Sequence, residues 1–162
     1  MVIKLPIVLS GLLVANAVDT VWWSGHAGSV VEHRDQHEVT CTLMLKDERN
    51  QLTVAWSNHL PLRVVFDSAA LRLAPDKVAQ IAVRVGEVWL AHGDGKPNIP
   101  VMTASSSVMF ILNEPIEEAL LRAHDISIRA DDQYITMKLM PSGVKDLVGA
   151  LGRCNAVIAR MG

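Results

Sequence analysis

The chain has no excess of charge of one sign and no long apolar run. Its 162 residues include 15 Lys and Arg against 17 Asp and Glu, which gives a formal net charge of −2. Nucleic-acid-binding domains present clustered basic residues, so no nucleic-acid partner is predicted. A membrane-spanning helix needs about 20 consecutive apolar residues. The apolar run at residues 5–14 is shorter than this, so no membrane-spanning segment is predicted.

Motifs of catalysis and cofactor binding are also missing. The stretch "GDGK" at residues 93–96 lacks the spacing and the following Ser or Thr of a phosphate-binding loop. The serines at 105–107 have no nucleophile motif around them and suggest a turn between strands. Adjacent Asp131 and Asp132 suit a hairpin turn, and Asp94 alone is far from the six to eight oxygens that calcium takes. No catalytic residue, metal ligand or cofactor is therefore predicted.

The first residues have the layout of a secretory signal peptide. Lys4 supplies the early positive charge, residues 5–14 form a short apolar region, and Ala15-Asn16-Ala17 provides the small residues at which signal peptidase cuts. We expect residues 1–17 to be removed, leaving residues 18–162 as a single exported domain. The alternative is that residues 2–14 form a buried strand or helix.

The chain has only two cysteines, and whether they form a disulfide depends on whether the protein is exported. Thiols are oxidised outside the cytosol, where an even count suggests pairing. Cys41 and Cys154 are the only pair that the chain offers. A bond between them would close a loop long enough to stabilise the fold by roughly 4–5 kcal/mol at most. Two free buried thiols, or a bond between two chains, are the alternatives.

The stretch "VEHRDQHEVTC", residues 31–41, raises the question of a metal site. His33 and His37 would share a face in a helix, but in a strand they would stand about 13 Å apart, too far for one ion. The charged residues around them lack the apolar period of a buried helix and are typical of a polar hairpin connection. Pairing of Cys41 with Cys154 would remove the best third ligand. No metal site is predicted, and a histidine-based site is the alternative.

Alternation of apolar and polar residues indicates β-strands along most of the chain. Ile81, Val83 and Val85 share one face, and Gly86-Glu87 follows as a tight turn. The expected strands are residues 39–46, 52–57, 62–66, 80–85, 88–92, 99–103, 108–112, 126–129 and 134–139. Most of these strands are separated by only a few residues, which is too short for the crossover that parallel strands need, so we expect antiparallel pairing.

Two segments near the C-terminus have helical spacing instead. In residues 113–124, Pro115 suits a first turn and two glutamates follow it. In residues 141–154, Ser142 is the expected cap, and Cys154 lies on the same face as Leu147. The predicted fold is therefore mainly β, a single-domain antiparallel β-sandwich or barrel-like fold with two short helices near the C-terminus.

The order of these motifs resembles the invasion-associated locus B family of exported proteins from alphaproteobacteria. The likeness rests on tryptophans soon after the leader, an early cysteine, short strands and a helix that ends in a cysteine. The matching pieces are Trp22, Trp23, Cys41, the strands around Trp56 and Phe66, "VRVGEVW", "EEALLRAHDISIRADDQYITMKL" and "SGVKDLVGALGRC". "EHRDQHE" departs from the family pattern.

The resemblance implies a small β-sandwich or barrel-like domain in the periplasm or at the cell surface, with a disulfide that joins an early strand to the final helix. It brings no catalytic residues to this chain. The family name reflects a role in host-cell entry for some members.

Aromatic residues are few, and four of the seven are tryptophans. Tryptophan often anchors protein interfaces. The alternative is that Trp22, Trp56 and Trp89 belong to the core, with Trp23 facing the other way. We expect a non-enzymatic periplasmic or cell-surface protein that binds an unknown protein, envelope component or host component. A periplasmic enzyme with a histidine-based metal site and a purely structural envelope protein are the alternatives.

Overall fold

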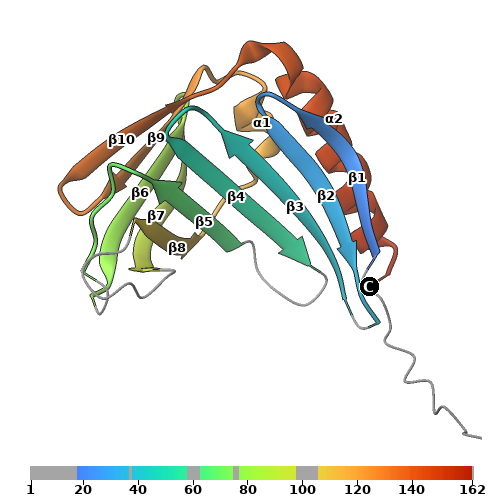
Figure 1. The fold of residues 1–162 in the computed structure, drawn as a ribbon, viewed down its shortest axis with the longest axis horizontal. Coiled ribbons are helices and arrows are strands. Elements are labelled where there is room, and N and C mark those ends of the chain that lie inside the picture. The colour runs from blue at the N-terminus through green and yellow to red at the C-terminus, as the bar shows by residue number, and fades with distance from the viewer. Residues whose placement is uncertain (1–17, 37, 58–62, 75–76, 98–105, 162) are drawn as a thin grey trace, which may run out of the picture.

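The computed structural model describes residues 18–36, 38–57, 63–74, 77–97 and 106–161, which form one open antiparallel sheet and two helices (Figure 1). The prediction of a mainly β, antiparallel fold with two helices near the C-terminus is confirmed. The strands are β1 (Val18–Gly25), β2 (Gly28–Arg34), β3 (Val39–Lys46), β4 (Asn50–Ser57), β5 (Arg63–Ser68), β6 (Ala79–Val85), β7 (Val88–Pro97), β8 (Ser107–Ile111), β9 (Asp125–Ala130) and β10 (Gln133–Lys138), and the helices are α1 (Glu117–Leu120) and α2 (Pro141–Ala159).

The ten strands of the described residues lie in the order β1-β2-β3-β4-β5-β8-β7-β6-β9-β10. The first five form a meander, and β6 is flanked by β7 and β9. The two halves join through β8, which pairs with β5 along its length but with β7 only at Lys96 and Pro97. The sheet is strongly curved, so that β6, β7, β9 and β10 run at a steep angle to β3–β5 (Figure 1).

Alternating apolar residues place one face of each strand in the core. In β3, Cys41, Leu43 and Leu45 are buried while the residues between them are partly exposed. Ile126 and Ile128 of β9 repeat this pattern. Successive residues of a strand point to opposite faces of the sheet, so one face of the curved sheet encloses the core and the other meets solvent.

The predicted polar hairpin connection before β3 is present at Asp35 and Glu38, but Glu32 and Arg34, which were assigned to it, belong to strand β2. β2 continues through Arg34, and the connection to β3 is a short turn in which the Asp35 amide donates to the carbonyl of Glu38 at 3.0 Å. Glu32 is buried in β2 because its carboxylate accepts bonds from the Trp22 indole at 3.1 Å and from Arg34 at 2.8 Å. These partners allow a charged residue to occupy an inward position.

Helix α2 packs against β1, β2 and β3. Pro141 begins it, and the backbone departs from helical geometry at Ser142 and at Gly143, which has φ +98°. The predicted cap at Ser142 is wrong, because no side chain forms a capping bond at this end. Neither described helix has the length and apolar character to cross a membrane.

The disulfide between Cys41 and Cys154 is present and fully buried. It joins β3 to α2 with a Cα–Cα distance of 6.0 Å, across 113 residues of sequence. Leu147 and Leu151 are buried on the same side of α2, as the helical spacing predicts. The intrachain pairing is therefore confirmed over the two alternatives.

Candidate binding site

Trp89 is the one tryptophan of the four that is exposed to solvent. Its exposed fraction is 55%, whereas Trp22, Trp23 and Trp56 are partly buried and pack against the core. The interpretation of Trp89 as a core residue is therefore wrong. A bulge in β1 at residues 21–23 shifts the register. Trp22 and Trp23 can therefore both pack inward, so the expectation that Trp23 faces away is also wrong.

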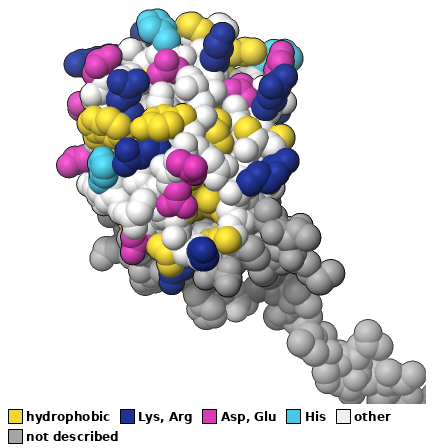
Figure 2. All heavy atoms as spheres, turned by 90° about the vertical axis from the view of Figure 1, so that its left-hand side faces the viewer, with side chains coloured by type: hydrophobic (Ala, Val, Ile, Leu, Met, Phe, Trp, Pro, Cys, Tyr) yellow, Lys and Arg dark blue, Asp and Glu magenta, His cyan; other side chains and the backbone are white. Residues whose placement is uncertain are grey.

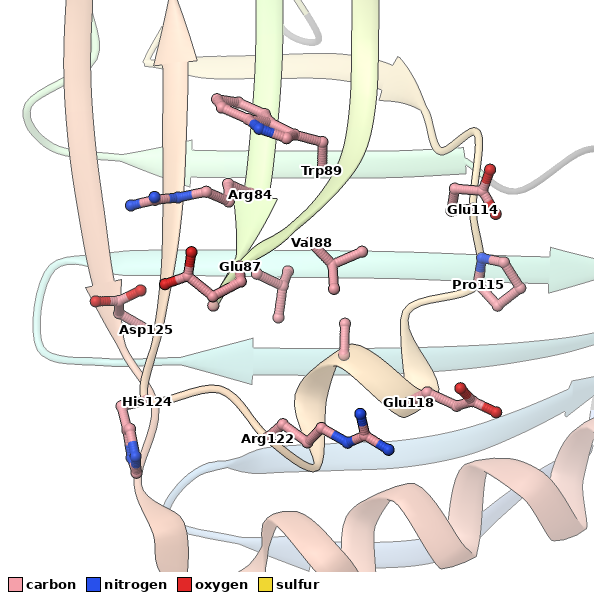
Figure 3. Close-up of a pocket in the computed structure, with 13 residues that line it drawn as sticks. Arg84, Glu87, Val88, Trp89, Glu114, Pro115, Glu118, Arg122, His124 and Asp125 are labelled. Atoms are coloured by element: carbon pink, nitrogen blue, oxygen red, sulfur yellow. The ribbon is translucent and has the colours of Figure 1, made fainter.

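A groove lies beside Trp89, with a volume of about 1010 Å³. Three segments build it: the β6–β7 turn, the connection from β8 to α1, and α1 with the residues that lead into β9 (Figure 3). Gly86 makes the tight turn with φ +57°, where the left-handed backbone favours glycine. Its amide donates to the carbonyl of Asp125 at 3.2 Å, which ties the turn to the start of β9. We call this hollow the Trp89 groove.

The Trp89 groove combines an apolar wall with a charged rim. Val88 is exposed beside Trp89, and Pro115 and Ala119 face it from the other segments. The charged groups of the rim are Glu87, Glu114, Glu118, Asp125, Arg84 and Arg122. None of the four carboxylates forms a salt bridge or a side-chain hydrogen bond within the described part of the chain.

A second hollow of about 570 Å³ continues the groove toward α2. Arg122 and His124 line both hollows, and Val144 and Val148 of α2 form part of the second. Leu121 lines it with an exposed fraction of 53%. Exposed apolar side chains, Val88 and Trp89 in the first hollow and Leu121 in the second, thus line both hollows.

On the solvent side of the sheet, Trp89 has two polar neighbours. The Arg84 guanidinium lies 6.0 Å from the centre of the indole ring, within the range of a cation–π contact. The His92 ring lies 5.4 Å away. Figure 2 looks onto the side of the molecule where β6, β9 and β10 lie, and hydrophobic side chains gather there among groups of both charges. Tyr134 of β10 is also exposed, with an exposed fraction of 75%.

The structure separates the residues considered for a metal site. Nδ1 of His33 lies 2.7 Å from an Asp19 oxygen, linking β2 to β1. Cys41 is committed to the disulfide, and His37 lies outside the described residues. Across the ranges that the structure describes, no three His, Cys, Asp or Glu side chains gather where they could hold an ion.

The other polar candidates have structural partners. Asp131 turns the chain between β9 and β10 with φ +53°, and its carboxylate accepts the Gln80 amide at 2.7 Å. Asp132 shares that turn, as predicted, and Asp94 accepts the Gln80 side chain at 2.6 Å. Ser107 is buried in β8 instead of lying in a turn.

Ser106 is exposed just before β8, and Ser105 lies outside the described residues. The predicted turn is therefore wrong at Ser107, which is a strand residue.

Asp47 connects the β3–β4 turn to the edge strand β10, a role that the sequence did not reveal. Its carboxylate accepts amide bonds from Arg49 and Asn50 within the β3–β4 turn, both at 2.9 Å. It also accepts the amide of Lys138, on the edge strand β10, at 3.1 Å. Burial raises the pKa of Asp47, but the hydrogen bonds from Arg49, Asn50 and Lys138 outweigh it and lower the pKa below 3.8.

Comparisons of the chain with protein-family models, with curated proteins and with solved structures found no match. The resemblance to the invasion-associated locus B family stays a prediction from sequence motifs. The chemistry of the Trp89 groove must therefore be inferred from its own side chains. These side chains are apolar surface, an aromatic ring and carboxylates that form no salt bridge among the described residues.

Proposed function

We propose that this protein is a non-enzymatic interaction protein that works outside the cytosol and binds a partner protein or envelope component through the Trp89 groove. The observation that carries the proposal is the exposure of Trp89 at 55% on the wall of a hollow of about 1010 Å³. An exposed tryptophan side chain does not contribute to stability the free energy that its burial would provide. Tryptophan and arginine are enriched among the residues that dominate binding energy at interfaces, and Arg84 lies against this one.

The disulfide supports a location outside the cytosol. A fully buried Cys41–Cys154 bond indicates an oxidising environment. The periplasm or the cell surface is the compartment that we propose, on the basis of the predicted leader at residues 1–17, which lie outside the described residues. A role like that of the invasion-associated locus B proteins, which the motifs resemble, fits this location.

A quantitative retention experiment tests the proposal. The full chain is expressed for export, purified, immobilised and exposed to envelope extract, alongside the variants Trp89→Ala and Tyr134→Ala. Tyr134 is the matched control because it is also an exposed aromatic, on β10 instead of beside the groove. Loss of an interface tryptophan costs about 2 kcal/mol or more, so a specific partner should bind Trp89→Ala more than tenfold more weakly.

Tyr134→Ala should retain that partner as the unmodified protein does. The proposal fails if folded Trp89→Ala protein retains the same proteins in the same amounts, or if the unmodified protein retains none specifically.

A further inference from the structure

We propose that the Trp89 groove takes a cationic segment of its partner, a stretch of polypeptide with lysine or arginine side chains. This inference rests on the proposed function and adds the chemical class of the partner. Four carboxylates of the groove face only two guanidinium groups. The excess of negative charge is local, because the whole chain has a net charge of only −2.

The carboxylates are available to a ligand. Within the described residues, Glu87, Glu114 and Glu118 form no salt bridge and no side-chain hydrogen bond. Glu118 and Arg122 stand four residues apart, the spacing of a helical ion pair, yet they make none. Figure 3 shows Glu87 at the turn, with Glu114 and Glu118 on the opposite side, so the carboxylates flank the hollow from different elements.

The positive groups are less able to neutralise this rim. The Arg84 guanidinium lies over the Trp89 ring at 6.0 Å and extends toward β9, away from Glu114 and Glu118 (Figure 3). Arg122 lines both hollows, and its guanidinium extends to the side of Glu118 (Figure 3) without forming a salt bridge among the described residues. The four carboxylates of the rim therefore remain in excess over its two guanidinium groups.

The apolar wall indicates a polypeptide instead of a lone ion. Val88, Pro115 and Ala119 line the hollow between the carboxylates, and a bare metal ion would gain nothing from them. Lysine and arginine carry apolar stems below their charged heads. Such side chains can place the stem against Val88 and the head against a carboxylate. The continuation into the second hollow gives room for neighbouring residues of the same segment.

Binding of two short labelled peptides to the full exported chain tests this inference. The peptides share alanine and leucine positions and differ in carrying either lysine or glutamate at the remaining ones. The lysine peptide should bind more tightly, and its affinity should fall as salt is raised, because salt screens exposed charges. A variant combining Glu87→Gln, Glu114→Gln and Glu118→Gln should weaken lysine-peptide binding about tenfold, from the sum of three exposed charge contacts.

Asp132→Asn is the matched control. This exposed carboxylate lies in the β9–β10 turn, at the other end of the strands from the groove, and its loss should leave the affinity unchanged. The inference is overturned if the glutamate peptide binds as tightly as the lysine peptide, if neither binds, or if the triple variant behaves as the unmodified chain does.

The failures of the two proposals can be told apart. If both peptides bind equally and Trp89→Ala weakens both, the charge preference is wrong while the groove remains the binding site. If Trp89→Ala changes neither affinity, the proposed function is wrong as well.

Discussion

A single carboxylate, that of Asp47, holds the edge strand β10 to the β3–β4 turn. Its pKa is lowered below 3.8 by hydrogen bonds that only the folded protein forms. For a carboxyl group with a depressed folded pKa, the stabilisation is present above the unfolded pKa and is lost as pH falls through the folded pKa. Asp47 should therefore support the fold at neutral pH and lose this effect in acid.

The variant Asp47→Asn should unfold at a lower temperature than the unmodified protein at neutral pH. Asparagine keeps one acceptor oxygen but loses the charge that strengthens bonds to the amides. The gap in Tm should narrow as pH falls below 3.8, because the native carboxyl then becomes neutral too. Thermal unfolding followed by circular dichroism across this range provides the measurement, and a gap independent of pH would contradict the assignment.

Individual residues were predicted well where their role is local. Asp131 and Asp132 do form a turn, because turn chemistry depends on neighbours in sequence. The role of Asp47 was missed, because one of its hydrogen-bond partners lies on the distant strand β10. Trp89 was assigned to the core, although it is exposed in the folded sheet. Trp89 pairs across the sheet with Arg84 at an irregular step of the β6–β7 ladder, which simple alternation does not reveal.

Among the strands, the close approach of β2 to β3 depends on Gly28. This residue has φ +152°, and an added Cβ would overlap the carbonyl oxygen of Met44 on β3. Gly28→Ala should therefore destabilise the fold by about 3 kcal/mol and lower Tm by roughly 6–12 °C.

Gly152 gives the matched control for this glycine. It lies exposed on α2, with open space where a Cβ would stand, so Gly152→Ala should stabilise the helix by up to about 1 kcal/mol. Equal effects of the two substitutions in a thermal unfolding experiment would show that the β2–β3 contact is not as tight as the geometry requires.

The strands with a clean alternation of apolar residues were predictable, as β3, β9 and β10 show. β2 was missed, because Glu32, His33 and Arg34 make its end look like a connection. The short α1 was found from Pro115 and the glutamates after it, but it has only four residues. Its length is set by tertiary packing, which periodicity does not reveal.

For the whole chain, the Cys41–Cys154 bond constrains 113 residues of sequence. Its loss should destabilise the fold by up to about 4–5 kcal/mol in the chain-entropy model. The double variant Cys41→Ser and Cys154→Ser should accordingly melt well below the unmodified protein. A reducing agent should lower the Tm of the unmodified protein but not that of the variant. Equal Tm values for the two proteins without reductant would show that the bond contributes little.

The sequence supported the fold class and the disulfide more fully than the candidate site. Apolar periodicity and a pair of cysteines can be read directly from the sequence. The Trp89 groove brings together residues between 84 and 125 that belong to four elements and their connections. No local motif links these residues, so only the folded chain brings Glu87 to face Glu118.

The location of the binding surface can be measured directly by NMR. The full exported chain is labelled with ¹⁵N and titrated with the lysine peptide, and the amide signals are followed. Amides of residues 84–89 and 114–125 should shift progressively, while those of β1–β4 should stay in place. Shifts confined to β1–β4, or no shifts at peptide concentrations that saturate binding, would contradict the assignment of the Trp89 groove as the binding site.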